Sequence, residues 1–270
     1  MKTIAYVALL LTFLARQQVN ADETSNFPKP GDAKAVHFAE ALPRIRHPSA
    51  ELKYDFDLAK EAFEVFVPKN YSSAEKFGLF AFIDSQNDMT FPAEWVSLME
   101  KQKLICLIPQ KIGNDQPPAR RLGLTLVGVI AAAQQYKIDQ KRIFTGGYSG
   151  GARCALHLAF LHSDVIKGNV SICGADFYEP VPRLRAADTR NYGFWPVAPE
   201  KVAEAKANVR FVFITGEKDL RYGNIVDICK GGFRKNNFVV NLIDVPGMGH
   251  QLCKPQILEQ GIEFLDNQTH

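Results

Sequence analysis

The sequence predicts an α/β fold in which helices cover both faces of a mostly parallel central sheet. Residues 78–83 (GLFAFI) and 104–108 (LICLI) are short, continuous apolar runs. Such runs are typical of strands buried on both faces, because these strands lack the polar–apolar alternation of half-exposed ones. Further runs of this kind alternate along the chain with helical segments, and that order favours parallel strands joined by helices.

The predicted elements follow one another from the N-terminal region to the end of the chain. We expect a helical turn near 35–42 and then two antiparallel strands at 54–58 and 62–67. The other predicted strands are 78–83, 104–108, 142–145, 168–172, 209–214 and 238–245. The predicted helices are 120–136, 150–162, 224–236 and 255–265. In the first of these helices, apolar residues recur at three- and four-residue steps, which is the period of an amphipathic helix.

The first residues have the pattern of a secretory signal peptide. Lys2 gives a basic start, residues 4–15 are apolar, and residues 19–21 (VNA) form a small-x-small cleavage site. The apolar run is too short to span a bilayer well. We therefore expect secretion to the periplasm or the medium, with a signal peptide at 1–21, an N-terminal leader at 22–50 and one domain at 51–270.

The charge balance argues against nucleic acid as a partner. The formal net charge is +3, and subtracting the two positive charges of Lys2 and Arg16 with the signal peptide leaves +1. Nucleic-acid-binding proteins concentrate basic residues, and a near-neutral chain offers no such excess. No later segment is long and apolar enough to span a membrane, so we expect no stable membrane insertion after cleavage.

Five cysteines are few for a secreted disulfide scaffold. Cys106, Cys154 and Cys173 lie in apolar stretches and are expected to be small buried hydrophobic residues. Cys229 and Cys253 lie in more polar surroundings, and an oxidising compartment leaves a bridge between them open. No cysteine or histidine spacing indicates a zinc site, so we expect no metal.

Four glycines surround one serine in the stretch RIFTGGYSGGAR, between a predicted strand and a predicted helix. Glycine costs backbone entropy, so this density needs a reason. The pentapeptide Gly147-Tyr148-Ser149-Gly150-Gly151 matches the G-x-S-x-G nucleophile elbow, a sharp strand-to-helix turn that exposes the serine. The alternative is a glycine-rich loop that happens to hold a serine.

Two further polar residues follow predicted strands at the same expected edge of the sheet. Asp219 comes after the strand at 209–214, and His250 comes after the strand at 238–245. Ligands of open parallel sheets bind beyond the carboxyl ends of the strands. The chain order Ser149, Asp219, His250 is that of α/β-hydrolase triads. In such a triad the histidine is the general base for the serine, and the aspartate orients the imidazole ring.

Other side chains compete for two of these roles. Glu217 also follows the strand at 209–214 and is the reserve for the carboxylate. His157 and His162 lie on the helix after the serine and are weaker candidates for the base. The sequence favours Asp219 and His250 over them.

With RIFTGGYSGGAR, FITGEKD and VPGMGH, the chain resembles the α/β-hydrolases over residues 51–266. More narrowly, it resembles the secreted esterases related to polyhydroxybutyrate depolymerases and feruloyl esterases. The resemblance implies an α/β-hydrolase fold with a short cap insertion at 176–206. It also implies a serine carboxylic-ester hydrolase that forms an acyl-enzyme on Ser149 and uses no cofactor. The expected partner is a small-molecule or polymer-linked ester.

The resemblance further implies an oxyanion hole made of two backbone N–H groups. One comes from Gly150, the residue after the nucleophile. The other comes from the loop after the strand at 78–83, where many relatives have His-Gly and this chain has Asp84-Ser85. The second donor is therefore Ser85 or Gln86. The candidate pocket residues are Tyr148, Gln86 and Trp195, and packing of the cap onto the sheet is an equal alternative for Trp195.

Two other functions fit the same elements. A serine peptidase of this fold is one, although many such peptidases carry a propeller or large cap domain that this chain lacks. A non-catalytic binding protein on the same scaffold is the other, because fold alone does not give function. The intact set of Ser149, Asp219 and His250 speaks against the binding protein, and the unusual Asp84-Ser85 loop speaks for it.

Overall fold

The computed structural model describes residues 28–37, 56–57, 60–182 and 194–267, with the backbone alone for 34–37. The predicted signal peptide (1–21) lies outside the described residues, so the signal peptide and secretion stay predictions. No helix within the described ranges is long and apolar enough to cross a membrane.

Among the described residues, eight strands form one sheet in the order β1-β2-β4-β3-β5-β6-β7-β8. The pairs β1–β2 and β2–β4 are antiparallel, and every other pair is parallel. This confirms the mostly parallel sheet that the sequence predicts. The strand bounds are β1 Ala33–His37, β2 Ala62–Phe66, β3 Phe77–Ile83, β4 Leu104–Pro109, β5 Ile138–Tyr148, β6 Gly168–Ile172, β7 Arg210–Thr215 and β8 Val239–Asp244.

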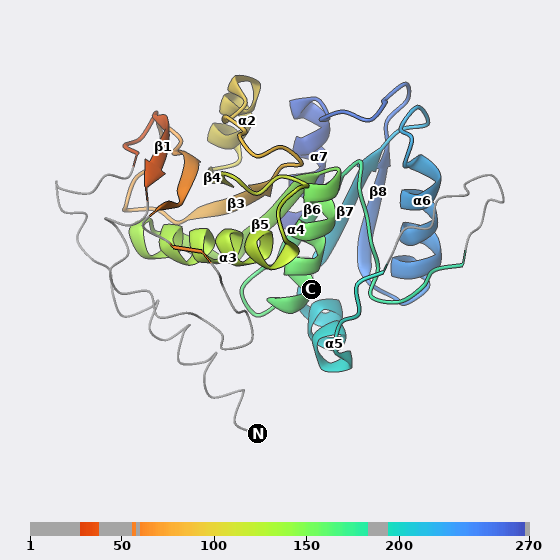
Figure 1. The fold of residues 1–270 in the computed structure, drawn as a ribbon. Helices are drawn as coiled ribbons and strands as arrows, with labels where there is room; N and C mark the ends of the chain where they lie inside the picture. The colour runs from red at the N-terminus through yellow and green to blue at the C-terminus, as the bar shows by residue number, and fades with distance from the viewer. Residues whose placement is uncertain (1–27, 38–55, 58–59, 183–193, 268–270) are drawn as a thin grey trace.

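Helices lie on both faces of this sheet, as predicted (Figure 1). The α-helices are α2 Val96–Lys101, α3 Pro118–Gln135, α4 Gly150–Leu161, α5 Pro199–Asn208, α6 Tyr222–Asp227 and α7 Pro255–Asp266. A 3-10 turn, η3 (Ala93–Trp95), precedes α2, and a π-helical segment, η4 (Ile228–Arg234), continues α6.

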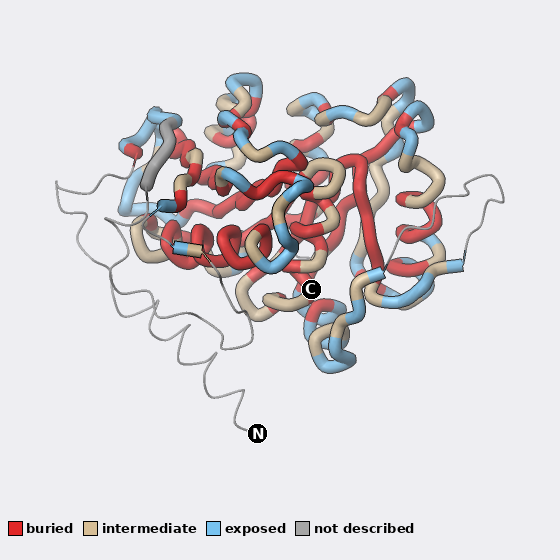
Figure 2. The backbone as a smooth tube through the Cα atoms, in the orientation of Figure 1, coloured by how far each residue is buried: buried red, intermediate tan, exposed pale blue. Residues whose placement is uncertain are grey.

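Strand β3 shows why the sheet is covered twice. Successive side chains of a strand point to opposite faces. Leu79 and Ala81 join the core beneath α3 and α4, whereas Phe80 and Phe82 join the core beneath η3, α2 and α7. All four side chains are fully buried. Figure 2 shows the buried strands in the middle of the molecule and exposed residues mainly in loops and on α5.

The parallel strands end together at one edge of the sheet. The register pairs Ile83 with Gly147, Tyr148 with Ile172, Ile172 with Ile214 and Thr215 with Asp244. Residues that directly follow β3, β5, β6, β7 and β8 are therefore brought together, although they are far apart in the sequence. This is the edge at which the sequence places the candidate site.

The start of the sheet differs from the prediction. Strand β1 occupies 33–37, where a helical turn near 35–42 was expected, and it pairs with β2. Of the strand expected at 54–58, only Phe56 and Asp57 are described, and neither lies in a strand. The sheet thus takes its first strand from the leader. Short polar–apolar segments such as this one become strands through long-range pairing, which local periodicity does not report.

The bridge between Cys229 and Cys253 that the sequence left open is not formed. All five cysteines are free and buried. Cys229 belongs to the core on the α3 and α4 face, and Cys253 belongs to the core on the α7 face. The sheet separates the two sulfur atoms, and sequence distance alone does not reveal on which face each one lies.

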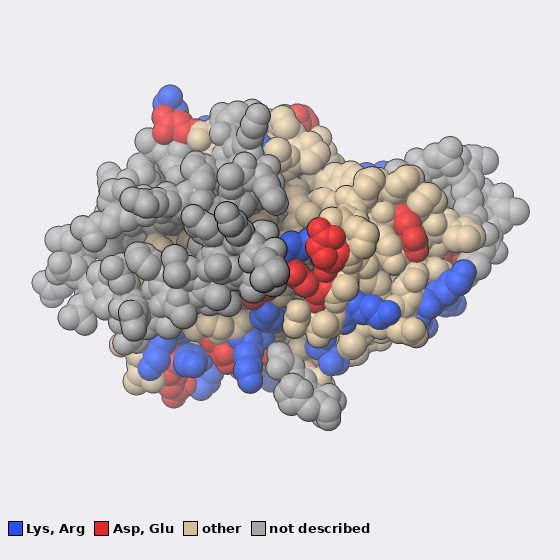
Figure 3. Space-filling view, turned by 90° about the horizontal axis from the view of Figure 1, so that it is seen from below, with Lys and Arg blue, Asp and Glu red and all other residues tan. Residues whose placement is uncertain are grey.

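Charged side chains of both signs are interspersed on the described part of the face seen in Figure 3. Opposite charges also pair within the described chain, as in the bidentate contact of Arg120 with Glu61 and that of Arg142 with Asp266. Such pairs leave fewer unbalanced charges on the described surface.

An aromatic cluster joins η4 to the sheet. Phe233 is fully buried, and its ring centroid lies 4.8 Å from that of Phe211, 5.0 Å from that of Phe213 and 5.1 Å from that of Phe238. Phe177, which follows β6, adds a fifth ring, whose centroid lies 4.9 Å from that of Phe233. The cluster fixes α6 and η4 against β7 and β8, and therefore fixes the loops that these strands end in.

We expect Phe233→Ala to lower the free energy of unfolding by about 3–5 kcal/mol, because it leaves a cavity among these rings. Urea denaturation followed by circular dichroism measures the change. Phe194→Ala is the matched control, since the Phe194 side chain is 43% exposed and its loss should cost less than about 1 kcal/mol. Equal losses in the two variants would contradict the cluster's role.

Candidate active site

Ser149 lies in a sharp turn between β5, which ends at Tyr148, and α4, which begins at Gly150. Its backbone has φ 55° and ψ −118°, a region that side-chain-bearing residues rarely adopt and that costs about 1–3 kcal/mol. The Ser149 N–H donates a hydrogen bond of 2.8 Å to the carbonyl oxygen of Ile172 at the end of β6. The neighbouring strand thus holds the strained residue in place.

Two of the surrounding glycines are required by close approach. A Cβ atom on Gly151 would lie 2.0 Å from the carbonyl oxygen of Ile83, at the end of β3. A Cβ atom on Gly147 would lie 2.5 Å from the carbonyl carbon of Gly151. No side chain fits at these distances. The glycines therefore allow α4 to begin directly against the edge of the sheet.

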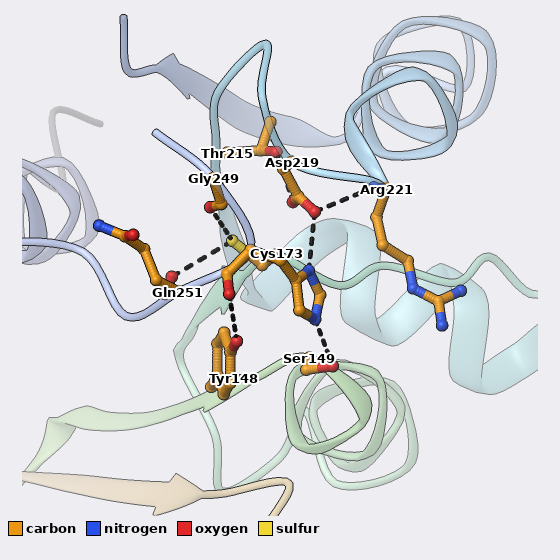
Figure 4. A network of polar contacts seen from close by, with 9 residues as sticks. Tyr148, Ser149, Cys173, Thr215, Asp219, Arg221, Gly249 and Gln251 are labelled. Carbon is orange, nitrogen blue, oxygen red and sulfur yellow. Dashed lines mark hydrogen bonds and ion pairs between the residues drawn. The ribbon is translucent and has the colours of Figure 1, made fainter. Parts of the chain in front are cut away.

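The structure brings Ser149, Asp219 and His250 together. Figure 4 labels Ser149 and Asp219 and shows an imidazole ring between them. His250 Nε2 lies 2.9 Å from Ser149 Oγ, and His250 Nδ1 lies 2.7 Å from Asp219 Oδ1. The Asp219 side chain is fully buried, whereas that of His250 is 23% exposed. Hydroxyl, imidazole and carboxylate are in the mutual contact that a nucleophile, its base and an orienting group require.

Asp219 is held by hydrogen bonds from both sides of its loop. The hydroxyl of Thr215, the last residue of β7, donates to Oδ2 at 2.9 Å. The backbone N–H of Arg221 donates to Oδ1 at 2.9 Å. Both carboxylate oxygens therefore have a protein donor besides His250, and the carboxylate cannot rotate without breaking one of these bonds.

The loop that carries His250 is tied to two strand ends. The Tyr148 hydroxyl donates to the carbonyl oxygen of His250 at 2.7 Å. The Cys173 thiol, just after β6, lies 3.3 Å from the carbonyl oxygen of Gln251 and 3.6 Å from that of Gly249. Burial raises the pKa of Tyr148 to about 12 and raises the pKa of the Cys173 thiol. Both groups therefore keep their protons and remain donors.

The competing residues lie elsewhere. Both carboxylate oxygens of Glu217 accept the N–H of Gly247 at 2.9 Å, so this side chain closes the histidine loop and does not orient the imidazole. The ring of His157 packs edge-on against Trp195 with centroids 4.4 Å apart. Burial lowers the pKa of His157 and of His162 to about 4. Neither histidine contacts Ser149.

The expected oxyanion donors differ in their surroundings. Gly150 begins α4, so its N–H has no partner within the helix. The Ser85 N–H instead donates to Oδ1 of its buried neighbour Asp84 at 2.7 Å. Burial raises the pKa of the Asp84 carboxyl, and the backbone N–H groups of Ser85 and Gln86 oppose that rise. The amides expected to supply the second donor are thus turned toward Asp84.

A cavity of about 380 Å³ opens beside Ser149. Trp195 lines it, whereas Tyr148 and Gln86, the other two predicted pocket residues, do not. The described residues of the cap segment thus contribute one aromatic wall. Sequence reasoning missed the three charged residues that line it, Arg121, Arg153 and Arg221. Each of them lies near the start of a helix at the carboxyl edge of the sheet. That position in the sequence could have identified them as candidate pocket residues.

Cys173, Asp219 and His250 also form the one group of potential metal ligands whose donor atoms lie within 4.8 Å of one another among the described residues. The thiolate is the form of cysteine that binds metals, and burial raises the pKa of this thiol. His250 Nδ1 already contacts Asp219. The donor set therefore fits a hydrogen-bonded network better than a metal centre.

No protein-family model matches this chain. No curated protein sequence matches it either. Solved structures do. A feruloyl esterase module from Clostridium thermocellum, complexed with sinapinate, aligns at 14% identity with a TM-score of 0.56, covering 78% of this chain and 85% of its own.

Two further structures show the same likeness. An S-formylglutathione hydrolase from Staphylococcus aureus aligns at 16% identity and TM-score 0.58, covering 76% of this chain and 92% of its own. An esterase from Thermogutta terrifontis aligns at 13% identity and TM-score 0.54, covering 86% and 100%. At such identities the likeness identifies the fold alone, and it confirms the α/β-hydrolase fold that the sequence predicts.

We expect Thr215→Val, which keeps the side-chain shape, to lower the free energy of unfolding by about 1–3 kcal/mol, because Oδ2 of buried Asp219 loses its donor. Urea denaturation at neutral pH measures the change. Thr90→Val, at an exposed position, is the control and should have little effect. A stability of Thr215→Val equal to that of the control would mean that this hydrogen bond does not hold the carboxylate.

Proposed function

We propose, from the α/β-hydrolase fold of this chain, that it is a serine hydrolase that cleaves carboxylic esters. One observation carries the proposal. Ser149 Oγ contacts Nε2 of an imidazole whose Nδ1 contacts a buried carboxylate, at 2.9 Å and 2.7 Å. The names of the structural neighbours, which are esterases and related hydrolases, support an ester as the substrate.

In the proposed reaction, Ser149 Oγ attacks the ester carbonyl carbon while His250 Nε2 takes the hydroxyl proton. The resulting tetrahedral intermediate collapses, its bond to the alcohol oxygen breaks, and His250 returns the proton to that oxygen. The acyl group is then bonded to Ser149. A water molecule, deprotonated by His250, attacks the acyl carbon, and the acid leaves as Ser149 regains its proton.

Asp219 has the orienting role in this proposal. It accepts the Nδ1 proton of His250, which leaves the Nε2 lone pair directed at Ser149. It also stabilises the imidazolium that forms during each proton transfer. The donors on Thr215 and Arg221 keep the carboxylate in this position, so these residues act through Asp219 and not on the substrate.

The oxyanion formed on the carbonyl oxygen would receive the N–H of Gly150, which lies at the positive start of α4. The second donor is the Ser85 N–H. It must break its hydrogen bond to Oδ1 of Asp84 before it can donate to the oxyanion. Loss of one such donor typically slows turnover by about 100–1000-fold. The Asp84 contact is therefore the one observation that favours the second candidate, a binding protein that uses the same cavity without catalysis.

We also propose that the chain is secreted, on the strength of the signal-like residues 1–21. The chemistry described above does not depend on this. The N-terminal sequence of the exported chain would test it, with Asp22 as the expected first residue.

We expect a fluorophosphonate to form an adduct on Ser149, located by mass spectrometry, because His250 and the helix start activate this hydroxyl. Ser149→Ala should lose both the adduct and the esterase activity with a nearly unchanged thermal midpoint. Ser97→Ala, on the exposed side of α2, is the control and should keep both. A folded wild-type chain that takes no label and hydrolyses no ester would replace the proposal with the binding protein.

We expect Tyr148→Phe to lower kcat by about five- to tenfold with little change in KM, because the loop carbonyl of His250 loses one hydrogen bond of roughly 1 kcal/mol. The labelling rate of Ser149 should fall by the same factor. Tyr71→Phe is the control, since the Tyr71 hydroxyl accepts the N–H of Lys137 beside the start of β3, at the opposite end of the strands from the site. An equal drop in kcat for both variants would point to general destabilisation instead.

A further inference from the structure

The cavity beside Ser149 is lined by three guanidinium groups, those of Arg121, Arg153 and Arg221. No aspartate or glutamate is among the residues that line it. A pocket for an uncharged ester needs no such excess of positive charge, since ligand pockets are usually apolar with a few polar groups. The charge of this wall therefore calls for an explanation in terms of the ligand.

The burial of Arg121 is the strongest observation. Only 5% of its surface is exposed. The N–H groups on its Nε and Nη2 donate hydrogen bonds to the carbonyl oxygens of Ile112 and Asp84. It forms no ion pair with any described residue. A guanidinium is always charged, and charged groups are almost never buried without a partner. The structure thus holds a fixed cation at the cavity wall that has no carboxylate in contact among the described residues.

The positions of Arg121 and Arg153 run against helix stability. Arg121 is the fourth residue of α3, and Arg153 is the fourth residue of α4. The first turn of a helix favours acidic side chains, because the helix dipole is positive there. Neither helix has an acidic residue in its first turn. Two helix starts and two arginines therefore add their positive potential at the same cavity.

Among the described acids near this wall, one pairs with Arg153 and none pairs with Arg121. Oδ2 of Asp176 accepts a hydrogen bond of 2.6 Å from the Nε–H of Arg153. The other carboxylate oxygen of Asp176, Oδ1, is buried and has no hydrogen-bond partner among the described residues. Burial raises the pKa of Asp176 to about 6, against the lowering effect of Arg153 and Arg221. Asp84 lies within electrostatic reach of Arg121. Arg153 thus has a carboxylate partner, whereas Arg121 forms no ion pair with a described residue.

The rest of the wall suits a carboxylate at the end of a short chain. Amides line it beside the arginines, at Asn114, Gln116 and Asn224, and can donate to carboxylate oxygens. Trp195 supplies an apolar surface for the carbon chain. Ser149 and Gly150 lie in the same wall, so a bound anion would be in the same cavity as the reacting carbonyl group.

We propose that the ester cleaved at Ser149 carries a carboxylate, which the guanidinium groups of Arg121, Arg153 and Arg221 bind inside the cavity. This inference rests on the proposed function and narrows it to anionic esters, such as the half-esters of dicarboxylic acids. Arginine suits this task because its planar fork can bind both carboxylate oxygens at once.

The test compares monoethyl adipate with ethyl hexanoate, which have the same length and differ in a carboxylate against a methyl group. We expect kcat/KM to be at least about tenfold higher for monoethyl adipate, as for one charge-assisted contact. Arg121→Met should reduce this ratio by about tenfold or more. Lys206→Gln removes one exposed positive charge on α5 outside the cavity wall and should leave the ratio unchanged.

Arg121 also ties two loop carbonyls, so its variant risks misfolding. Arg221→Gln serves as the second variant, because its side chain lines the cavity from another loop, and it should also lower the ratio. Equal kcat/KM values of the wild-type enzyme for ethyl hexanoate and monoethyl adipate would overturn the inference and leave the proposed function intact.

A binding measurement separates the two proposals. Ser149→Ala lacks the nucleophile, so calorimetry can measure its affinity for monoethyl adipate without turnover. We expect Ser149→Ala to bind monoethyl adipate at least about tenfold more tightly than ethyl hexanoate. Its affinity for monoethyl adipate should fall when Arg221→Gln is added. Tight, arginine-dependent binding in a protein that hydrolyses neither ester would sink the proposed function and keep the anion site. Equal affinities of Ser149→Ala for monoethyl adipate and ethyl hexanoate would overturn the proposal of an anion site.

Discussion

The strained backbone of Ser149 is the constraint on which the arrangement of the site depends. A residue with φ 55° keeps that conformation only where its surroundings over-determine it. Here a hydrogen bond to Ile172 fixes the residue from one side, and the start of α4 presses against the end of β3 from the other. The hydroxyl therefore has one position, and the imidazole of His250 has to be brought to it.

The strand ends supply that positioning in turn. Tyr148 at the end of β5 and Cys173 after β6 hold the loop of His250, which itself follows β8. Thr215 at the end of β7 holds Asp219. Ser149 and His250 are thus fixed by strands other than the ones that deliver them, whereas Asp219 is held by the last residue of its own strand. These hydrogen bonds connect the three side chains to the sheet, which is itself held by the aromatic packing against β7 and β8. The side chains are therefore positioned as rigidly as the strand ends.

The sequence predicts the parts of this site that leave a local signal. Ser149 has its glycines, and Asp219 and His250 stand directly after apolar strands, so their meeting follows from the parallel sheet. Contacts between distant segments leave no such signal. The pairing of β1 with β2 replaced an expected helical turn, and the turn of the Ser85 N–H toward Asp84 depends on burial of that carboxylate. Cys173 also follows a strand directly, and the same rule applied to every strand end would have found it.

The close approach of Gly151 to the end of β3 has a consequence for how this chain can change over evolutionary time. A Cβ atom at position 151 would lie 2.0 Å from the carbonyl oxygen of Ile83 and 2.6 Å from its carbonyl carbon, and this backbone cannot turn aside as a side chain can. A larger residue there would push α4 away from β3, and the turn that carries the serine would move with it. Position 151 is therefore expected to stay glycine among descendants of this sequence that keep the turn, whereas position 150 can change if the side chain at position 114 moves.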